Sequence, residues 1–307
     1  MIRRTLLPFL RSYLILLLGV IILTIPLYIG TISLFEKRQL AITSEGMKSD
    51  IDRLDQQVVS LNSIAYSFGN DSMLRSYATK NFQELKPSDL YAISKLQSDF
   101  QRLYLAQPYI TDYGLMLRNG ILFTSERLHF PNEQYYNHYI QFGEIKQQDL
   151  FNAFIKAPTS SLFLGEMNVV MMQNVPEITR SYRGSIWLCS LSKTPSKSPI
   201  GVFYATLSQN TLAQLFLRDL DEESAGFVLW NGQGEELMRY GLTPEPGITH
   251  DMHVIHVSAK RTSLNVTLFL SPSLFSDMMI PVYNLMILFL CGLLLFGILM
   301  SAVLAWR

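Results

Sequence analysis

Three histidines, His250, His253 and His256, lie within the heptapeptide HDMHVIH and are the residues best suited to metal chemistry. Imidazole nitrogens are common zinc ligands. The surrounding pattern predicts a strand over residues 252–258, however, and side chains in a strand alternate between its two faces. His253 and His256 would then point in opposite directions, and His250 lies in the preceding loop. We therefore predict no metal site and expect exposed histidines on an edge strand.

Catalytic motifs are absent from the sequence. It contains no GxSxG, HExxH, Walker loop or CxxC pair. The segment Gly232-Gln233-Gly234 is too short for a phosphate loop and lies between two predicted strands, so it indicates a tight turn. We predict no catalytic residue, no metal and no cofactor. An enzyme would need an active site in the middle of the chain, and no nucleophile with a neighbouring base is visible there.

Two long apolar segments flank the middle of the chain and must position any site that it contains. Residues 12–35 and 278–306 contain no charged side chain. At about 1.5 Å per residue, the shorter segment forms a helix of roughly 36 Å, enough to cross a ~30 Å hydrocarbon layer. A cleaved signal peptide is the alternative for residues 12–35. Its apolar core would be only about 7–15 residues long and would end at small residues, whereas this segment ends in SLFEKRQ.

Arginines flank both segments and predict the orientation of the chain. They are Arg3, Arg4, Arg11 and Arg307. Short positively charged flanks favour the cytoplasm. We therefore expect residues 1–11 and the C-terminus inside the cell, residues 36–277 outside, and a protein of the cell membrane whose two spans contact the lipid bilayer.

Charge and cysteine content limit the partners of the outer part. The chain has 25 basic and 25 acidic side chains; without the four flanking arginines, 21 basic residues face 25 acidic ones. This mildly acidic balance predicts no contact with nucleic acid. Cys189 lies in the outer part and Cys291 in the second apolar segment, so the two cannot pair. The outer domain must rely on its hydrophobic core.

The helix that begins in the first apolar segment is predicted to continue to about residue 69. Beyond residue 46, apolar residues alternate at spacings of four and three, which is typical of a helix packed against a partner. Ile51, Leu54, Val58 and Leu61 belong to this apolar stripe, and we expect them to transmit signals. Polar residues, among them Asp50, Asp52 and Asp55, occupy the positions expected to face outward. A helix over residues 87–107 is the expected partner of the stripe.

The middle of the chain then changes to the two-residue period of strands. Asp112 to Leu117 alternates in polarity, and Asn119-Gly120 favours a hairpin turn. The expected strands cover residues 113–117, 121–125, 161–164, 169–172, 185–191, 201–207, 226–230, 236–240, 252–258 and 264–270. Short helices are expected over residues 71–80, 147–156 and 209–220, and a polar loop over residues 192–199.

This order of elements resembles an α+β double Cache receptor, in which two PAS-like sheets are carried on one long helix. The stretches DYGLMLRNGILFTS and GVFYATLSQNTLAQLF are similar to parts of the first sheet, and GFVLWNGQGEELMRYG resembles the start of the second. The resemblance is to the extracellular halves of membrane-bound AraC-type regulators and of YesM-like sensor histidine kinases of Firmicutes. It implies a long helix and membrane-distal subdomain over residues 36–220 and a smaller membrane-proximal subdomain over residues 221–277.

The resemblance also implies a pocket for a small ligand, such as a sugar or another metabolite, in the membrane-distal sheet. Amino-acid-binding members carry an Arg-x-Trp-Tyr run in the segment that here reads SERLHFPNEQYYNHYIQF. Arg127, Tyr135 and Tyr136 are present without that run, which argues against an amino acid bound in the usual way. Arg183 and Trp187, on or beside a predicted strand, could also line the pocket. The alternative is that these aromatic side chains belong to the core.

The resemblance finally implies a function. We expect the ligand-sensing and transmembrane half of a homodimeric receptor for signal transduction, with its output domain beginning after Arg307. The output would be an AraC-type DNA-binding domain for transcription regulation, or alternatively a histidine kinase. A membrane assembly protein that senses no ligand is the remaining alternative.

Overall fold

A computed structural model describes most of the chain and shows an α+β fold. The described residues are 2–102, 108–125, 128–129, 140–145, 161–172, 179–191, 199–218, 220–243 and 252–306. The helix expected over residues 147–156 and most of the polar loop over residues 192–199 lie outside these ranges. The chain forms two compact units, one made of Met1–Gly46 with Ser271–Arg307 and the other of Met47–Leu270.

The first unit consists of apolar helix from both ends of the sequence. It contains the beginning of α1 (Ile2–Asn70) and nearly all of α7 (Pro272–Trp306). Both helices are long and apolar enough to cross a membrane, and only 0% and 6% of their most apolar windows are buried within the protein. Apolar side chains left so uncovered differ from those of a core helix. Within this unit the ring of Tyr28 lies 5.4 Å from that of Tyr283.

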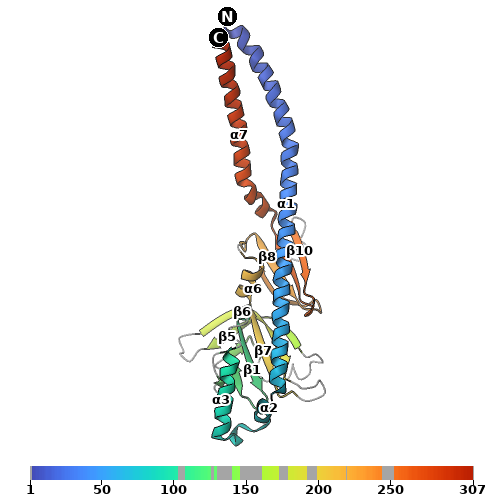
Figure 1. Cartoon of the computed structure of the whole chain (residues 1–307), viewed down its shortest axis with the longest axis vertical. Helices are drawn as coiled ribbons and strands as arrows, with labels where there is room; N and C mark the ends of the chain where they lie inside the picture. Colours follow the sequence, from blue (N-terminus) through green and yellow to red (C-terminus); the bar gives the residue numbers. More distant parts are fainter. Residues whose placement is uncertain are drawn as a thin grey trace. The chain divides into compact units, whose positions relative to one another are not determined.

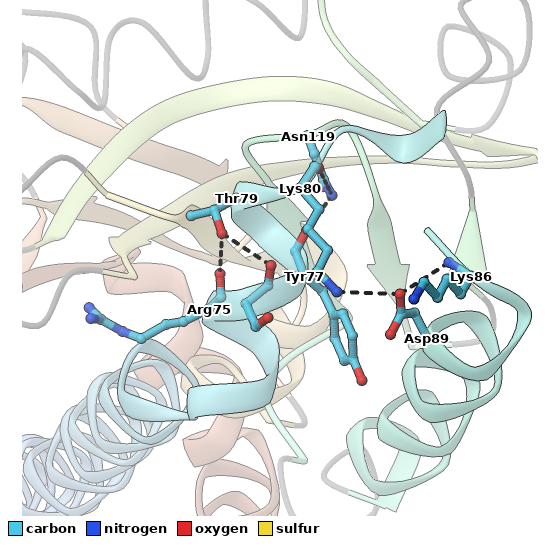
Figure 2. Close-up of polar contacts among 8 residues, drawn as sticks. Arg75, Tyr77, Thr79, Lys80, Lys86, Asp89 and Asn119 are labelled. Carbon is cyan, nitrogen blue, oxygen red and sulfur yellow. Dashed lines mark hydrogen bonds and ion pairs between the residues drawn. The ribbon is translucent and has the colours of Figure 1, made fainter. Parts of the chain in front are cut away.

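The second unit begins with the remainder of α1, followed by α2 (Ser72–Thr79), the short η1 (Phe82–Glu84) and α3 (Pro87–Arg102). α1 ends at Asn70, where the sequence predicts its end. Asp71 then caps α2 by accepting a hydrogen bond from the Leu74 amide at 2.7 Å. Figure 2 shows how the hairpin turn is fastened to this region: the Asn119 amide group donates to the carbonyl oxygens of Tyr77 and Lys80, at 2.8 and 3.2 Å.

Asp89 stabilises the start of α3. It accepts the Lys86 amide at 3.0 Å and pairs with the Lys80 ammonium at 3.3 Å (Figure 2). The first contact resembles half of a capping box, in which a side chain in the first turn satisfies an otherwise free backbone N–H. The Lys86 amide, together with the charge and hydrogen bond of Lys80, lowers the pKa of the Asp89 carboxyl below its ordinary value.

A seven-stranded antiparallel sheet follows, with strand order β3-β2-β1-β7-β6-β5-β4. Its strands are β1 (Asp112–Leu117), β2 (Leu122–Thr124), β3 (Leu128–His129), β4 (Ile140–Phe142), β5 (Ser161–Met172), β6 (Thr179–Ser190) and β7 (Gly201–Ser208). The predicted hairpin is confirmed, since Gly114 pairs with Thr124 and Met116 with Leu122. Gly120 closes its turn at φ 87°, which glycine adopts without strain.

A four-stranded antiparallel sheet completes the second unit, with strand order β10-β11-β8-β9. Its strands are β8 (Ala225–Trp230), β9 (Glu236–Gly241), β10 (His253–Ser258) and β11 (Asn265–Leu270), and α6 (Gln209–Phe216) precedes it in the chain. The two sheets, which Figure 1 shows along the lower part of α1, meet directly. The Ser185 hydroxyl of β6 donates to the Leu237 carbonyl of β9 at 2.6 Å.

The structure corrects two expected elements. Residues 161–164 and 169–172 are not separate strands, because both belong to the continuous strand β5. The pairing of β5 with β6 shifts register between Leu164 and Met167. A bulge of this kind adds residues without ending the strand. α6 ends at Phe216 instead of residue 220, and Arg218 shortly after it adopts φ 53°, outside the helical region.

The long helix is also packed differently from the expectation. Ile51, Leu54, Val58 and Leu61 are buried as predicted, at 0–1% exposure. Their surroundings include the chain's own sheets, since Asn62 of α1 accepts the Cys189 thiol of β6 at 3.6 Å. The helix α3 reaches α1 farther along, where the ring of Phe100 lies 5.5 Å from that of Phe68. The stripe is therefore covered by other elements of the same chain.

Candidate ligand-binding site

The two faces of the seven-stranded sheet differ in what covers them. Tyr113, Trp187 and Phe203 share one face, because cross-strand partners in the ladder point the same way. The ring of Phe100 on α3 lies 4.9 Å from that of Tyr113 and 6.2 Å from that of Phe203. We call this the helix-facing side. Because α3 packs on this side, we consider the opposite side of the sheet as the candidate site and call it the ligand face.

The ligand face is mostly apolar. Its buried cluster consists of Met116, Leu122, Phe142, Val169, Ile186, Leu188, Val202 and Tyr204, with Leu162, Leu164, Met167 and Tyr182 packed against it. Phe142 of β4 contacts the Tyr204 ring edge-on at 5.3 Å. The Tyr204 ring lies over Gly114, where any added Cβ would come within 2.2 Å of it. Glycine at position 114 therefore makes room for an aromatic ring on this face.

Polar groups of the ligand face gather across β1, β7 and β6. The hydroxyl groups of Tyr182 and Thr206 are 2.6 Å apart, and Thr206 donates to the Asp112 carbonyl at 3.2 Å. The Asp112 carboxylate also accepts a hydrogen bond from the Ser125 hydroxyl at 2.5 Å. Hydroxyl and carboxylate groups beside an apolar surface are the types of group that orient small ligands in proteins.

The predicted ligand-binding residues are not brought together where the structure describes them. Arg127, Tyr135 and Tyr136 lie outside the described residues. Trp187 is 1% exposed on the helix-facing side, where its ring lies 6.0 Å from that of Phe203. The side chain of Arg183 is 68% exposed and pairs with Glu166 at 3.2 Å. Trp187 thus packs as a core residue, and the predicted binding roles of all five residues stay predictions.

Sequence reasoning did not single out Asp112, Tyr182 or Thr206. The alternation in DYGLML could have placed Asp112 on the same face as Gly114 and Met116. Tyr182 belongs to the part of β6 that extends before the predicted strand, which begins at residue 185. Thr206 and Asp112 are register partners on β7 and β1, a pairing that only the tertiary structure reveals.

Burial controls the chemistry of the cysteine on the helix-facing side. Loss of water contact raises the pKa of the Cys189 thiol to about 12, because burial disfavours the thiolate. The thiol is therefore protonated at neutral pH and donates to Asn62. A nucleophilic or metal-binding cysteine needs a thiolate, so Cys189 has a packing role.

The histidines occupy an edge strand, as the sequence predicts. His253 and His256 lie on β10 at the border of the four-stranded sheet, and His250 lies outside the described residues. The ring Nδ1 of His256 is 2.9 Å from the hydroxyl of Thr267, its partner on β11. Within the described ranges, no three His, Cys, Asp or Glu side chains are grouped closely enough to hold a metal ion.

Comparisons with known proteins find similarity of structure alone. No protein-family model and no curated protein matches the chain. The periplasmic sensory domain of the Campylobacter jejuni chemoreceptor Tlp1 is 13% identical with a TM-score of 0.49, over 79% of this chain and 97% of that one.

Two similar structures come from Pseudomonas aeruginosa amino acid chemoreceptors. The ligand-binding domain of PctB, in complex with L-Arg, is 12% identical with a TM-score of 0.43, over 77% of this chain and 95% of its own. The ligand-binding domain of PctC, in complex with GABA, is 10% identical with a TM-score of 0.42, over 77% of this chain and 100% of that one. Similarity this low assigns neither a ligand nor an output to this chain.

Proposed function

We propose that this chain is the ligand-sensing and transmembrane half of a bacterial receptor. The observation that supports the proposal best is the continuity of α1, a single helix from Ile2 to Asn70. Its first part is apolar and uncovered, and its later part carries a stripe buried within the sheet-containing unit. A helix built in this way connects a membrane to a folded domain. A second uncovered apolar helix, α7, directly follows the last strand.

The proposal includes the topology and domain division expected from the sequence. Residues 12–35 and 278–306 cross the membrane, and the arginine flanks place both termini in the cytoplasm. Residues 36–220 comprise the long helix and the membrane-distal subdomain with the seven-stranded sheet, and residues 221–277 form the membrane-proximal subdomain with the four-stranded sheet. The protein is a homodimer whose output is an AraC-type DNA-binding domain or, as the alternative, a histidine kinase. No catalytic role is assigned to this chain.

The sensed compound is a small molecule that binds the ligand face. Its apolar part would contact side chains such as Met116, Ile186 and Tyr204, which are buried. Its polar groups would exchange hydrogen bonds with the hydroxyl groups of Tyr182 and Thr206, which lie 2.6 Å apart. Binding acts as a signal only if the ligand has different affinities for two conformations of the receptor.

A matched pair of tyrosine variants tests this placement. The full chain in detergent micelles would be screened by thermal shift against sugars, organic acids and amino acids, and affinities would then be measured for the compounds that raise the Tm. Tyr182→Phe removes a hydroxyl from the ligand face, and we expect affinity to fall about fivefold or more, the equivalent of one hydrogen bond. Tyr113→Phe removes a hydroxyl that donates to the Phe100 carbonyl at 2.7 Å on the helix-facing side.

Tyr113→Phe is the control variant, and it should lower the stability of the protein while leaving its affinity for the ligand unchanged. Equal affinities for wild type and Tyr182→Phe would contradict the proposed site. A panel that yields no binding compound would contradict the sensing function and favour the assembly protein. Affinity that falls in Tyr113→Phe but not in Tyr182→Phe would move the site to the other side of the sheet.

A further inference from the structure

Two carboxylates of α1 are buried although their sequence positions predict exposure. Asp50 and Asp55 are 2% and 3% exposed. Burying a carboxylate is costly unless hydrogen bonds and opposite charges replace its water. Both side chains have such partners: Asp55 binds the turn between β10 and β11, and Asp50 binds Arg218, which lies just after α6 in the connection to β8.

Asp55 binds the turn between β10 and β11. Its Oδ1 accepts the Thr262 amide at 2.8 Å and the Thr262 hydroxyl at 2.6 Å, and its Oδ2 accepts the Arg261 amide at 3.1 Å. The turn is closed by a bond of 2.7 Å from the Ala259 amide to the Leu264 carbonyl, and Ser263 adopts φ 56°. One carboxylate thus satisfies three donors of a tight turn, two of them in its backbone.

Asp50 binds the segment that leads from α6 to β8. Its Oδ2 accepts the Arg218 guanidinium at 2.6 Å, and Arg53 lies farther away at 3.9 Å. Arg218 has the left-handed backbone conformation noted above, which is unfavourable for a residue with a Cβ. Such a conformation persists where surrounding contacts determine it, and the short contact with a buried carboxylate is one of them.

We propose that Asp50 and Asp55 form an acidic latch that fixes the four-stranded sheet to α1. One carboxylate holds the segment before the first strand of that sheet, and the other holds the turn between its last two strands. The sheet therefore moves with α1 as one body. This inference does not depend on the identity of a ligand or on the output domain, and it gives the sheet a mechanical role beyond sensing.

The latch adds a second route from the seven-stranded sheet to α1, beside the direct hydrogen bond from Cys189 of β6 to Asn62. Glu166 of β5 and Gln209 of α6 both contact the backbone of Arg239 on β9, at 3.4 and 2.6 Å. Displacement of β5 or α6 is thus applied to β9. Because the latch joins the same sheet to α1, the displacement is delivered to the helix at Asp55 and Asp50.

Hydrogen exchange measured by mass spectrometry on the full chain in detergent micelles tests the latch. Asp55→Asn removes the charge and the acceptor of the Arg261 amide while keeping the shape of the side chain. We expect amide exchange in residues 253–258 and 265–270 to rise about tenfold, since charge-assisted bonds are roughly twice as strong as neutral ones. Exchange in residues 112–117 and 201–208 of the other sheet should change less than twofold.

Asp52→Asn is the matched control. Asp52 pairs with Lys260 of the same turn at 3.2 Å, but the two side chains are 30% and 70% exposed, and exposed pairs contribute little. We expect a change below twofold in every peptide. If Asp55→Asn does not fold, Thr262→Val removes only the hydroxyl contact, and exchange in β10 and β11 should rise about fivefold.

Two results would overturn the proposal. Exchange in β10 and β11 that stays within twofold of wild type in both Asp55→Asn and Thr262→Val would show that the turn is held by other contacts. An equal increase in both sheets would show that Asp55 stabilises the whole unit and does not specifically fix one sheet to α1.

Discussion

Replacing Leu54 tests whether the apolar stripe of α1 belongs to the core of a single chain. Leu54 is 0% exposed, and its neighbours in the stripe, Ile51 and Val58, are 0% and 1% exposed. Truncating a fully buried leucine to alanine costs about 2–5 kcal/mol, because contacts are lost and a cavity remains. For a unit the size of Met47–Leu270, each kcal/mol lowers the Tm by about 2–4 °C. Leu54→Ala should therefore lower the Tm by roughly 4–20 °C.

The assay is thermal and urea unfolding of the full chain in detergent micelles, followed by tryptophan fluorescence at several protein concentrations. Gln56→Ala is the control, because Gln56 lies half a turn away and is exposed; its effect should stay within about 0.5 kcal/mol. The loss caused by Leu54→Ala should not depend on protein concentration. A loss below about 1 kcal/mol, or one that disappears on dilution, would show that the stripe packs mainly against a partner chain.

Three further predictions concern single side chains of the second unit. The pKa of Asp89 is lowered in the folded protein, so the stability that this carboxylate contributes is present above its ordinary pKa of 3.8 and is lost as the pH falls through its pKa in the folded state. Asp89→Asn should therefore flatten the acid limb of a plot of Tm against pH. An unchanged acid limb would contradict this prediction. Alkylation of Cys189 at pH 8, in a Cys291→Ser background, should proceed only as fast as the unit unfolds, because burial raises the pKa of its thiol to about 12. Rapid labelling of the folded chain would contradict that burial. Gly114→Ala should destabilise the unit by about 1–3 kcal/mol through contact with the Tyr204 ring, and by clearly less in a Tyr204→Ala background; equal losses in chemical unfolding would show that the two residues do not meet.

Local patterns account for what the sequence predicted well. The hairpin at Asn119-Gly120, the end of α1 and the helix α2 all depend on residues close together in the chain. The apolar spacing of Ile51, Leu54, Val58 and Leu61 identified a buried stripe, because a helix repeats its surface every 3.6 residues. Such signals require no knowledge of distant partners.

Long-range contacts account for what the sequence did not reveal. Asp55 was expected to face outward, and its burial depends on Thr262, 207 residues away. The helical period shows only that Asp55 lies off the apolar stripe; the partner that covers it belongs to another element. The continuity of β5 similarly depends on a bulge whose pairing with β6 keeps the strand in the sheet.

The sequence predicted strands of the sheet that carries the proposed site, and it did not single out the residues of that site. The period of two in Asp112 to Leu117 located a strand of the seven-stranded sheet, but it could not show which side the helices occupy. Trp187 was considered for the pocket because it lies on or beside a predicted strand, and the structure places it on the helix-facing side. The side that α3 covers became known only from the structure, in which the ring of Phe100 packs against those of Tyr113 and Phe203.

The location of the sheet-containing unit tests the receptor proposal most directly. Two reporters would be inserted in turn near Ser196 of the full chain, one that is active only in the cytoplasm and one that is active only outside the membrane. The receptor account predicts a silent cytoplasmic reporter and an active external one, because residues 36–277 lie outside. A strongly active cytoplasmic reporter at this position would contradict the account, since a sheet inside the cell could not sense a ligand outside it.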